Sequence, residues 1–260
     1  GEPSTDQTYT VANSAPTVTI NKAGGQADPT NTSPIEFTVV FSETVTGFDE
    51  TDVSISGIAG TPTVIVTGTG PTYTVSVSGM VSGETVTASI PANAAQDTAS
   101  NNSAASTSTD NSVVYDTSAP TITINDPNTS PATSKTITAS VSDGTLTMSN
   151  TSGSTCDGTL TFVAYSSQTF SLESDNGTKV CYKAVDALGN TGYSMSNAIT
   201  GIDTSAPSVT SFTLKTPPTS PTNADTLTFL ATFSEPVTDV DILDFVKNSS
   251  STASVTNVTQ

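Results

Sequence analysis

One short phrase occurs three times along the chain, and its spacing sets the size of the folding unit. Ser-Ala-Pro is followed by an alternating, strand-like segment at Ser14–Ile20, Ser118–Ile124 and Ser205–Thr210. The prolines of this phrase are about 104 and then about 87 residues apart. Self-similarity at such a spacing indicates repeated structural units, and about 100 residues is the size of one two-sheet β-sandwich. The sequence therefore predicts a tandem array of β-sandwich domains.

Alternation of apolar and polar residues predicts seven strands in each complete repeat, with Gly and Pro between them. In the first repeat the expected strands are Thr17–Ile20, Ile35–Phe41, Val53–Ile55, Thr63–Val66, Tyr73–Val77, Thr85–Ile90 and Ser106–Tyr115. In the second they are Thr121–Ile124, Thr136–Val141, Thr145–Met148, Thr159–Tyr165, Thr169–Leu172, Lys179–Val185 and Tyr193–Ile202. No stretch has a sustained helical period, so the predicted fold class is all-β.

Similarity between distant segments predicts incomplete repeats at both ends. Thr5–Val11 is similar to Thr109–Tyr115, and Thr228–Thr238 is similar to Phe37–Thr46. Half a sandwich cannot bury its inner face, so we expect the last segment to continue in further sequence or to pair with another chain. The predicted organisation is residues 1–14 as the C-terminal strand of a preceding repeat, 15–118 and 119–205 as complete repeats, and 206–260 as the N-terminal part of a further repeat.

Three motifs give the chain a resemblance to a known family. Asp116–Pro120 and Asp203–Pro207 both read Asp-Thr-Ser-Ala-Pro, Phe41–Phe48 reads Phe-Ser-Glu-Thr-Val-Thr-Gly-Phe, and Asp186–Asn190 reads Asp-Ala-Leu-Gly-Asn. With these motifs the whole chain resembles the tandem bacterial immunoglobulin-like repeats of large surface adhesins and related cell-surface proteins. The resemblance implies immunoglobulin-like sandwiches of about seven strands, joined by short Asp-Thr-Ser-Ala-Pro linkers, in an extracellular protein. Such modules often serve as spacers, so the fold alone does not specify a ligand.

The charge balance is strongly acidic and argues against two classes of partner. Six Lys stand against 24 Asp and Glu, and the net charge is −18. Phosphate backbones are bound by clusters of Lys and Arg, and an anionic membrane surface repels such a chain. We therefore expect neither nucleic-acid binding nor direct membrane insertion, since no apolar run approaches the length of a membrane span. The acidity serves either the solubility of an exposed protein or the binding of divalent cations.

Acidic and amide side chains recur in the loops expected at one end of each sandwich, beside the linker from the preceding domain. Oxygen atoms of such side chains are the ligands that Ca²⁺ prefers, and a bound ion would stiffen the joint. The alternative is that these are ordinary turn residues. Ala12 stands where Asp116 and Asp203 stand at later joints, so a weaker site or none is expected there. The predicted structural calcium ligands are Glu43, Asp97, Asn101, Asp116, Asp143, Asp186, Asn190, Asp203 and Glu235.

The two cysteines, Cys156 and Cys181, both fall in the second complete repeat. In an extracellular protein they are expected to form a disulfide. The alternative is two free buried thiols.

Catalysis has little support in the sequence. The chain has no His, which excludes Ser-His and Cys-His pairs. It also has no Trp to line a sugar-binding cleft. We expect no enzymatic activity.

Three functions fit this pattern. The first is a non-catalytic spacer in a bacterial surface adhesin, stiffened by Ca²⁺ at its joints and contacting neighbouring repeats of the same chain. The second is a building block of an extracellular filament, sheath or surface layer, assembled with other copies through its incomplete terminal repeats. The third is a calcium-dependent ligand-binding module.

Overall fold

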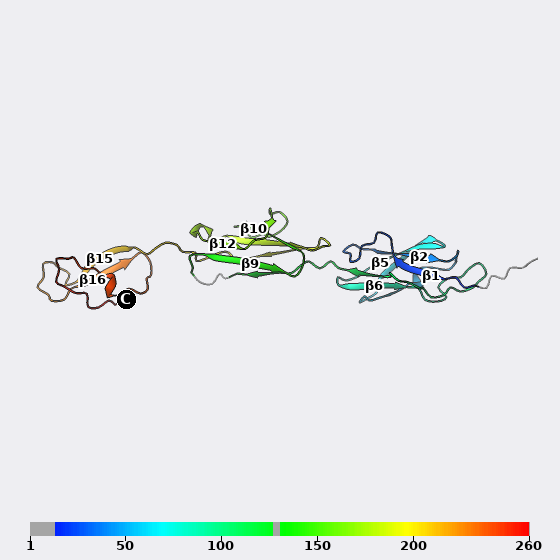
Figure 1. The fold of residues 1–260 in the computed structure, drawn as a ribbon, viewed down its shortest axis with the longest axis horizontal. Coiled ribbons are helices and arrows are strands. Elements are labelled where there is room, and N and C mark those ends of the chain that lie inside the picture. Colours follow the sequence, from blue (N-terminus) through cyan, green and yellow to red (C-terminus); the bar gives the residue numbers. More distant parts are fainter. Residues whose placement is uncertain (1–13, 127–130, 260) are drawn as a thin grey trace, which may run out of the picture.

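The computed structural model describes residues 14–126 and 131–259, which form three successive units arranged in a line (Figure 1). The described residues form antiparallel β-sheets together with short single-turn 3-10 helices. The predicted all-β class is therefore confirmed. The strand expected in residues 1–14 and the departure at Ala12 lie outside the described residues, apart from Ser14.

The first unit contains two sheets whose strands agree closely with the seven expected from the sequence. Every neighbouring pair of strands is antiparallel. The last strand is shorter than expected: residues 106–111 are held by scattered backbone and side-chain hydrogen bonds to the segments at 18–22 and 88–90, outside the paired strand β7. One sheet has the order β1 (Val18–Lys22), β2 (Ile35–Phe41), β5 (Thr72–Ser78), β4 (Thr63–Thr69), and the other has the order β3 (Ser54–Ser56), β6 (Glu84–Ser89), β7 (Ser112–Tyr115).

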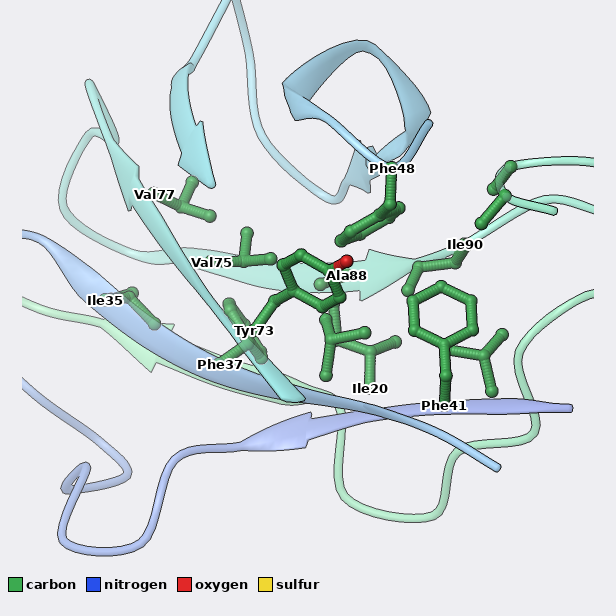
Figure 2. Close-up of a cluster of buried hydrophobic side chains, with 14 of the residues drawn as sticks. Ile20, Ile35, Phe37, Phe41, Phe48, Tyr73, Val75, Val77, Ala88 and Ile90 are labelled. Atoms are coloured by element: carbon green, nitrogen blue, oxygen red, sulfur yellow. The ribbon is translucent and has the colours of Figure 1, made fainter. Parts of the chain in front are cut away.

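The core of the first unit lies between its two sheets (Figure 2). Every second residue of β2 is buried, as expected for a strand with one face on a core. Phe37 of β2, Val75 of β5 and Val86 of β6 are all 0% exposed and belong to one cluster. Two sheets that share one apolar core in this way are consistent with a β-sandwich.

The first and last parts of this unit run side by side in the same direction. The amide of Ala104 donates to the carbonyl of Pro16, and the amide of Thr107 donates to the carbonyl of Val18. Further along, the amide of Lys22 donates to the carbonyl of Asp110. The segment that enters the unit is thereby hydrogen-bonded to the segment that leaves it.

The second unit also has two sheets, but one strand lies in a different sheet from its counterpart in the first unit. The predicted strand Thr159–Tyr165 is reduced to two residues, and it pairs with β10 rather than with the strand that follows it. One sheet has the order β12 (Gln168–Phe170), β9 (Lys135–Val141), β8 (Ile122–Asn125), and the other has the order β11 (Val163–Ala164), β10 (Thr145–Thr151), β13 (Lys179–Val185), β14 (Thr191–Met195).

A disulfide explains this change of sheet. Val180 and Tyr182 on β13 belong to the core cluster, so Cys181 between them faces the outer side of the sheet. Cys181 is nevertheless 0% exposed, because the predicted disulfide joins it to Cys156 with the Cα atoms 5.4 Å apart. The connection between β10 and β12 is thus held across the outer face of the sheet, where Phe162 also packs against Tyr193.

The third unit repeats the start of the first unit but has only one sheet among its described residues. That sheet pairs β15 (Val209–Thr216) with β16 (Thr228–Phe233). A serine at the end of the second strand ties the two strands together in all three units. The hydroxyl of Ser234 accepts from the amide of Ser208 at 3.0 Å, just as Ser42 accepts from Thr17 and Ser142 from Thr121.

A capped 3-10 turn is also shared by the first and third units. Asp49 caps η1 (Glu50–Asp52) and Asp241 caps η3 (Ile242–Asp244), and the backbone amide of each cap residue donates to the carboxylate of the last Asp of its turn. The third unit therefore has the local structure of a repeat. What it lacks among the described residues is the set of strands that covers the inner face in the first unit.

Candidate functional site

Two predicted site loops fold into the same turn in the first and second units. In the second, one carboxylate oxygen of Asp186 accepts from the amides of Leu188 and Asn190, at 2.9 and 2.8 Å. Its other oxygen accepts from the side-chain amide of Asn190 at 2.8 Å. In the first unit Asp97 and Asn101 make the same contacts, at distances that differ by 0.1 Å or less. Each carboxylate thus closes its own loop.

The turn of the second unit also forms the joint with the first unit. The side-chain amide of Asn190 donates to the backbone carbonyl of Asp116 in the linker, at 3.1 Å. From the first unit, the Asn31 amide donates to the carbonyl of Leu188 at 2.8 Å and to Oδ1 of Asn190 at 3.1 Å. Asn190 therefore contacts its own unit, the linker and the preceding unit at once.

The linker itself is fixed to the first unit. One carboxylate oxygen of Asp116 accepts from the amide of Ser118 and from the hydroxyl of Ser82, both at 2.9 Å. The amide of Thr117 donates to the same hydroxyl oxygen at 2.8 Å. These hydrogen bonds, the Ser118 amide first, hold the pKa of Asp116 below its usual value.

On the other side, the linker lies directly against β14. A Cβ atom placed on Gly192 would come 2.4 Å from the carbonyl oxygen of Pro120. Pro120 is itself buried. Only a glycine fits at this position, and the close contact sets how near the second unit lies to its own linker.

At the second joint, the linker is held by a different side chain. One oxygen of Glu173 accepts from the amide and hydroxyl of Thr204 and from the hydroxyl of Ser205, at 3.0, 3.2 and 2.8 Å. The carboxylate of Asp203 accepts from the amide of Ser205. The third unit shows no contact equivalent to that of Asn190 among its described residues, since its described strands end at β16.

The predicted calcium ligands are only partly brought together. Hydrogen bonds pair Asp97 with Asn101 and Asp186 with Asn190. The backbone carbonyl of Asp116 contacts Asn190. Glu43 and Asp143 are exposed just after strands, Asp203 is exposed in the second linker, and Glu235 is half-buried. Within residues 14–126 and 131–259, no group of three or more Asp, Glu, His or Cys is close enough to hold a metal ion.

Sequence reasoning missed the residues that make the joint from the preceding unit. Asn31 lies in a loop with no motif, and Ser82 and Glu173 belong to loops of different sequence in the two repeats. Thr30 places Asn31, because its amide and carbonyl bond to Val114 and Asp116. Thr30 and the end of the unit are far apart in the sequence, so a sequence pattern could not show that they pair.

The chain matches no protein-family model, and no curated protein matches it.

No helix among the described residues is both long and apolar enough to cross a membrane.

The contacts of Glu173 predict a pH-dependent joint. Bonds from Ser205 and Thr204, the Ser205 hydroxyl first, lower the pKa of Glu173 from its usual 4.5. A lowered pKa in the folded state means that the contribution to stability is complete above pH 4.5 and is lost as the pH falls through the folded pKa. We expect the amide signals of Thr204 and Ser205 to shift in an NMR titration below pH 4.5. The Glu173→Gln variant should lack this transition. An unchanged titration in that variant would mean that another group causes the transition.

Proposed function

We propose that this chain is a non-catalytic, extracellular spacer built from immunoglobulin-like repeats, with the joints as its functional sites. The sheet orders of the first unit support the proposal, because a seven-strand immunoglobulin constant-type sandwich also has a four-stranded sheet facing a three-stranded one. The disulfide in the second unit supports an oxidising, extracellular location. The single observation that supports the spacer function best is the joint at Asn190, because a spacer must hold successive units in a fixed line.

The joint is small, polar and directional. Its contacts are hydrogen bonds between the amides of Asn31 and Asn190 and backbone carbonyls of Leu188 and Asp116. Such bonds contribute about 1 kcal/mol each when the alternative is water. They therefore define the relative orientation of the two units more than they contribute to the free energy that holds the units together. This suits a rod whose strength resides in the covalent linker.

The spacer proposal predicts that the first two units tumble as one body. We expect the Asn190→Ala variant, which removes the cross-joint amide, to let them reorient separately. NMR relaxation should then give the two units shorter, distinct correlation times, and small-angle scattering should give a broader distribution of maximum dimension. The matched control is Asn101→Ala, which alters the equivalent turn away from this joint. Independent tumbling of the two units in the unmodified chain would contradict the proposal.

Calcium remains a separate prediction of the sequence. In the described arrangement the Asp186 carboxylate accepts three hydrogen bonds from N–H groups, and the Asp116 carboxylate accepts two hydrogen bonds. A rise in melting temperature with millimolar CaCl₂ that EDTA reverses and Asp186→Asn abolishes would establish the ion. A melting temperature that EDTA does not change would mean that hydrogen bonds hold the joint without the ion.

A second candidate function, assembly with other chains, is favoured by one observation. The third unit exposes large apolar side chains on the sheet face that is buried in the first unit. Filaments and surface layers are built through surfaces of this kind.

A further inference from the structure

The last residue in a β-bridge before each linker is Tyr115 in the first unit and Ile202 in the second. These residues correspond to one another, because each forms a parallel bridge with the segment that precedes the second strand of its unit, at Thr30 and at Ala132. On its other side, Tyr115 pairs with β6, and its carbonyl accepts from the amide of Gly83 at 2.8 Å. Main-chain hydrogen bonds therefore hold the exit of the first unit on both sides.

At the exit of the second unit, a side chain takes the place of one of these main-chain partners. Nδ2 of Asn176 donates to the carbonyl of Ile202 at 3.0 Å, and Oδ1 of Asn176 accepts from the amide of Ile202 at 3.1 Å. Beside it, the amide of Gly177 donates to the carbonyl of Ile199 at 2.8 Å. An asparagine side chain has both a donor and an acceptor, whereas an ionised aspartate has acceptors only. The exit of this unit therefore depends on an intact side-chain amide.

The same asparagine stands in a chemically labile pair. Asn176 is followed by Gly177, and Asn-Gly occurs once in the chain. Deamidation begins when the main-chain nitrogen of the following residue attacks the side-chain amide carbon, and a glycine has no side chain to hinder that approach. Both residues are exposed, so water reaches them. In the folded unit, however, the Asn176 side chain is bonded to Ile202 and the Gly177 nitrogen to Ile199, so both reacting groups are engaged until this corner opens.

We propose that Asn176 is a spontaneous modification site, which deamidates when the exit of the second unit opens and then no longer forms both bonds to Ile202. The nitrogen of Gly177 forms a bond to Cγ of Asn176 and gives up its proton, and the side-chain amide leaves as ammonia. Water then adds across one of the two C–N bonds of the resulting succinimide, so that aspartate or isoaspartate stands at 176. The reaction needs only water, and no group is oxidised or reduced. This inference does not rest on the spacer function.

The modification acts on the second linker as well. Asn176 is the C-cap residue of η2 (Glu173–Asp175), and Glu173 of the same turn accepts from Thr204 and Ser205. The new carboxylate has no hydrogen to donate and places an oxygen against the carbonyl oxygen of Ile202, which leaves that carbonyl without its donor. The turn and the exit are then no longer joined as before, so a unit that has once opened is permanently changed at its exit.

The chemistry is tested on the full chain by mass spectrometry of its peptides, which detects the replacement of NH₂ by OH. In mildly alkaline buffer with guanidinium chloride, Asn176 should deamidate at least about tenfold faster than Asn150, an exposed asparagine of the same unit that is followed by Thr. Without denaturant, deamidation of Asn176 should be slower by about tenfold or more, because local opening must come first. Equal rates at the two asparagines in denaturant, or an equal rate at Asn176 with and without denaturant, would overturn the proposal.

The structural effect is tested with the Asn176→Asp variant, which carries one product of the reaction. At neutral pH, amide hydrogen exchange at Gly177 and Ile202 should accelerate by about tenfold, because a hydrogen bond is lost and a carbonyl is left unpaired. The matched control is Asn150→Asp, whose side chain contacts Gln168 and not the exit. Unchanged exchange in Asn176→Asp, or the same acceleration in Asn150→Asp, would contradict the proposed role of Asn176.

Discussion

Replacing Phe37 by Ala should destabilise the first unit by about 3–5 kcal/mol, the cost of removing a fully buried aromatic ring from a packed core. Phe37 is 0% exposed and lies among residues of β5 and β6. Its removal leaves a cavity, since the two sheets are held apart by the remaining side chains. Native-state hydrogen exchange should report the loss as a drop in protection of β2 and β5 by a factor of 100 or more, on the order of tenfold per 1.4 kcal/mol.

The matched substitution is Phe229→Ala in the third unit. Phe229 occupies the same position in the repeat but is 48% exposed, so we expect a cost below about 1.5 kcal/mol. The comparison isolates the effect of burial, because the residue type, the strand within the repeat and the register are the same. Similar losses for both substitutions would show that the third unit buries this ring in solution.

Removing the disulfide should produce the second large effect, confined to the second unit. The Cys156→Ser/Cys181→Ser variant frees a loop of 25 residues, which in the chain-entropy model costs about 3 kcal/mol. The connection that covers the outer face of β13 should detach, and β11 should lose its pairing with β10. Hydrogen exchange in β10 and β13 should then accelerate by about 100-fold.

The first unit provides the internal control for this prediction, since both cysteines lie in the second. Its exchange rates should stay unchanged in the variant. Treating the unmodified chain with a reductant should reproduce the variant's behaviour. Exchange that accelerates equally in both units would mean that the units unfold together, and a variant as protected as the unmodified chain would mean that the core alone holds β11.

The sequence was most informative where a single strand face is buried. The run Ile35–Phe41 alternates except at Val40, and the structure places β2 at the same residues. The repeated Ser-Glu motif predicted equivalent strand ends, and Ser42 and Ser234 make the same hydrogen bond. Periodicity and repetition are local, so they can be read without knowing the contacts between distant segments.

Non-local contacts decided the rest. The segment Thr159–Tyr165 reads as a strand, but periodicity does not say which sheet it joins; the bond from Cys156 to a distant strand decides that. The candidate site shows the same limit. The sequence places Asp186 and Asn190 in the same loop, whereas Asn31 is brought to them only by the packing of one unit on the next.

The side-by-side course of the first and last segments of the first unit has a mechanical consequence. The amides at 104, 107 and 22 bond to carbonyls at 16, 18 and 110, so the entering and leaving segments run parallel. A pull applied through the two linkers acts along these segments and across their hydrogen bonds. All of these hydrogen bonds are then loaded in shear at the same time, so they do not break one after another. A unit with this geometry resists stretching by the arrangement of a few bonds at its ends, before its core bears any tension.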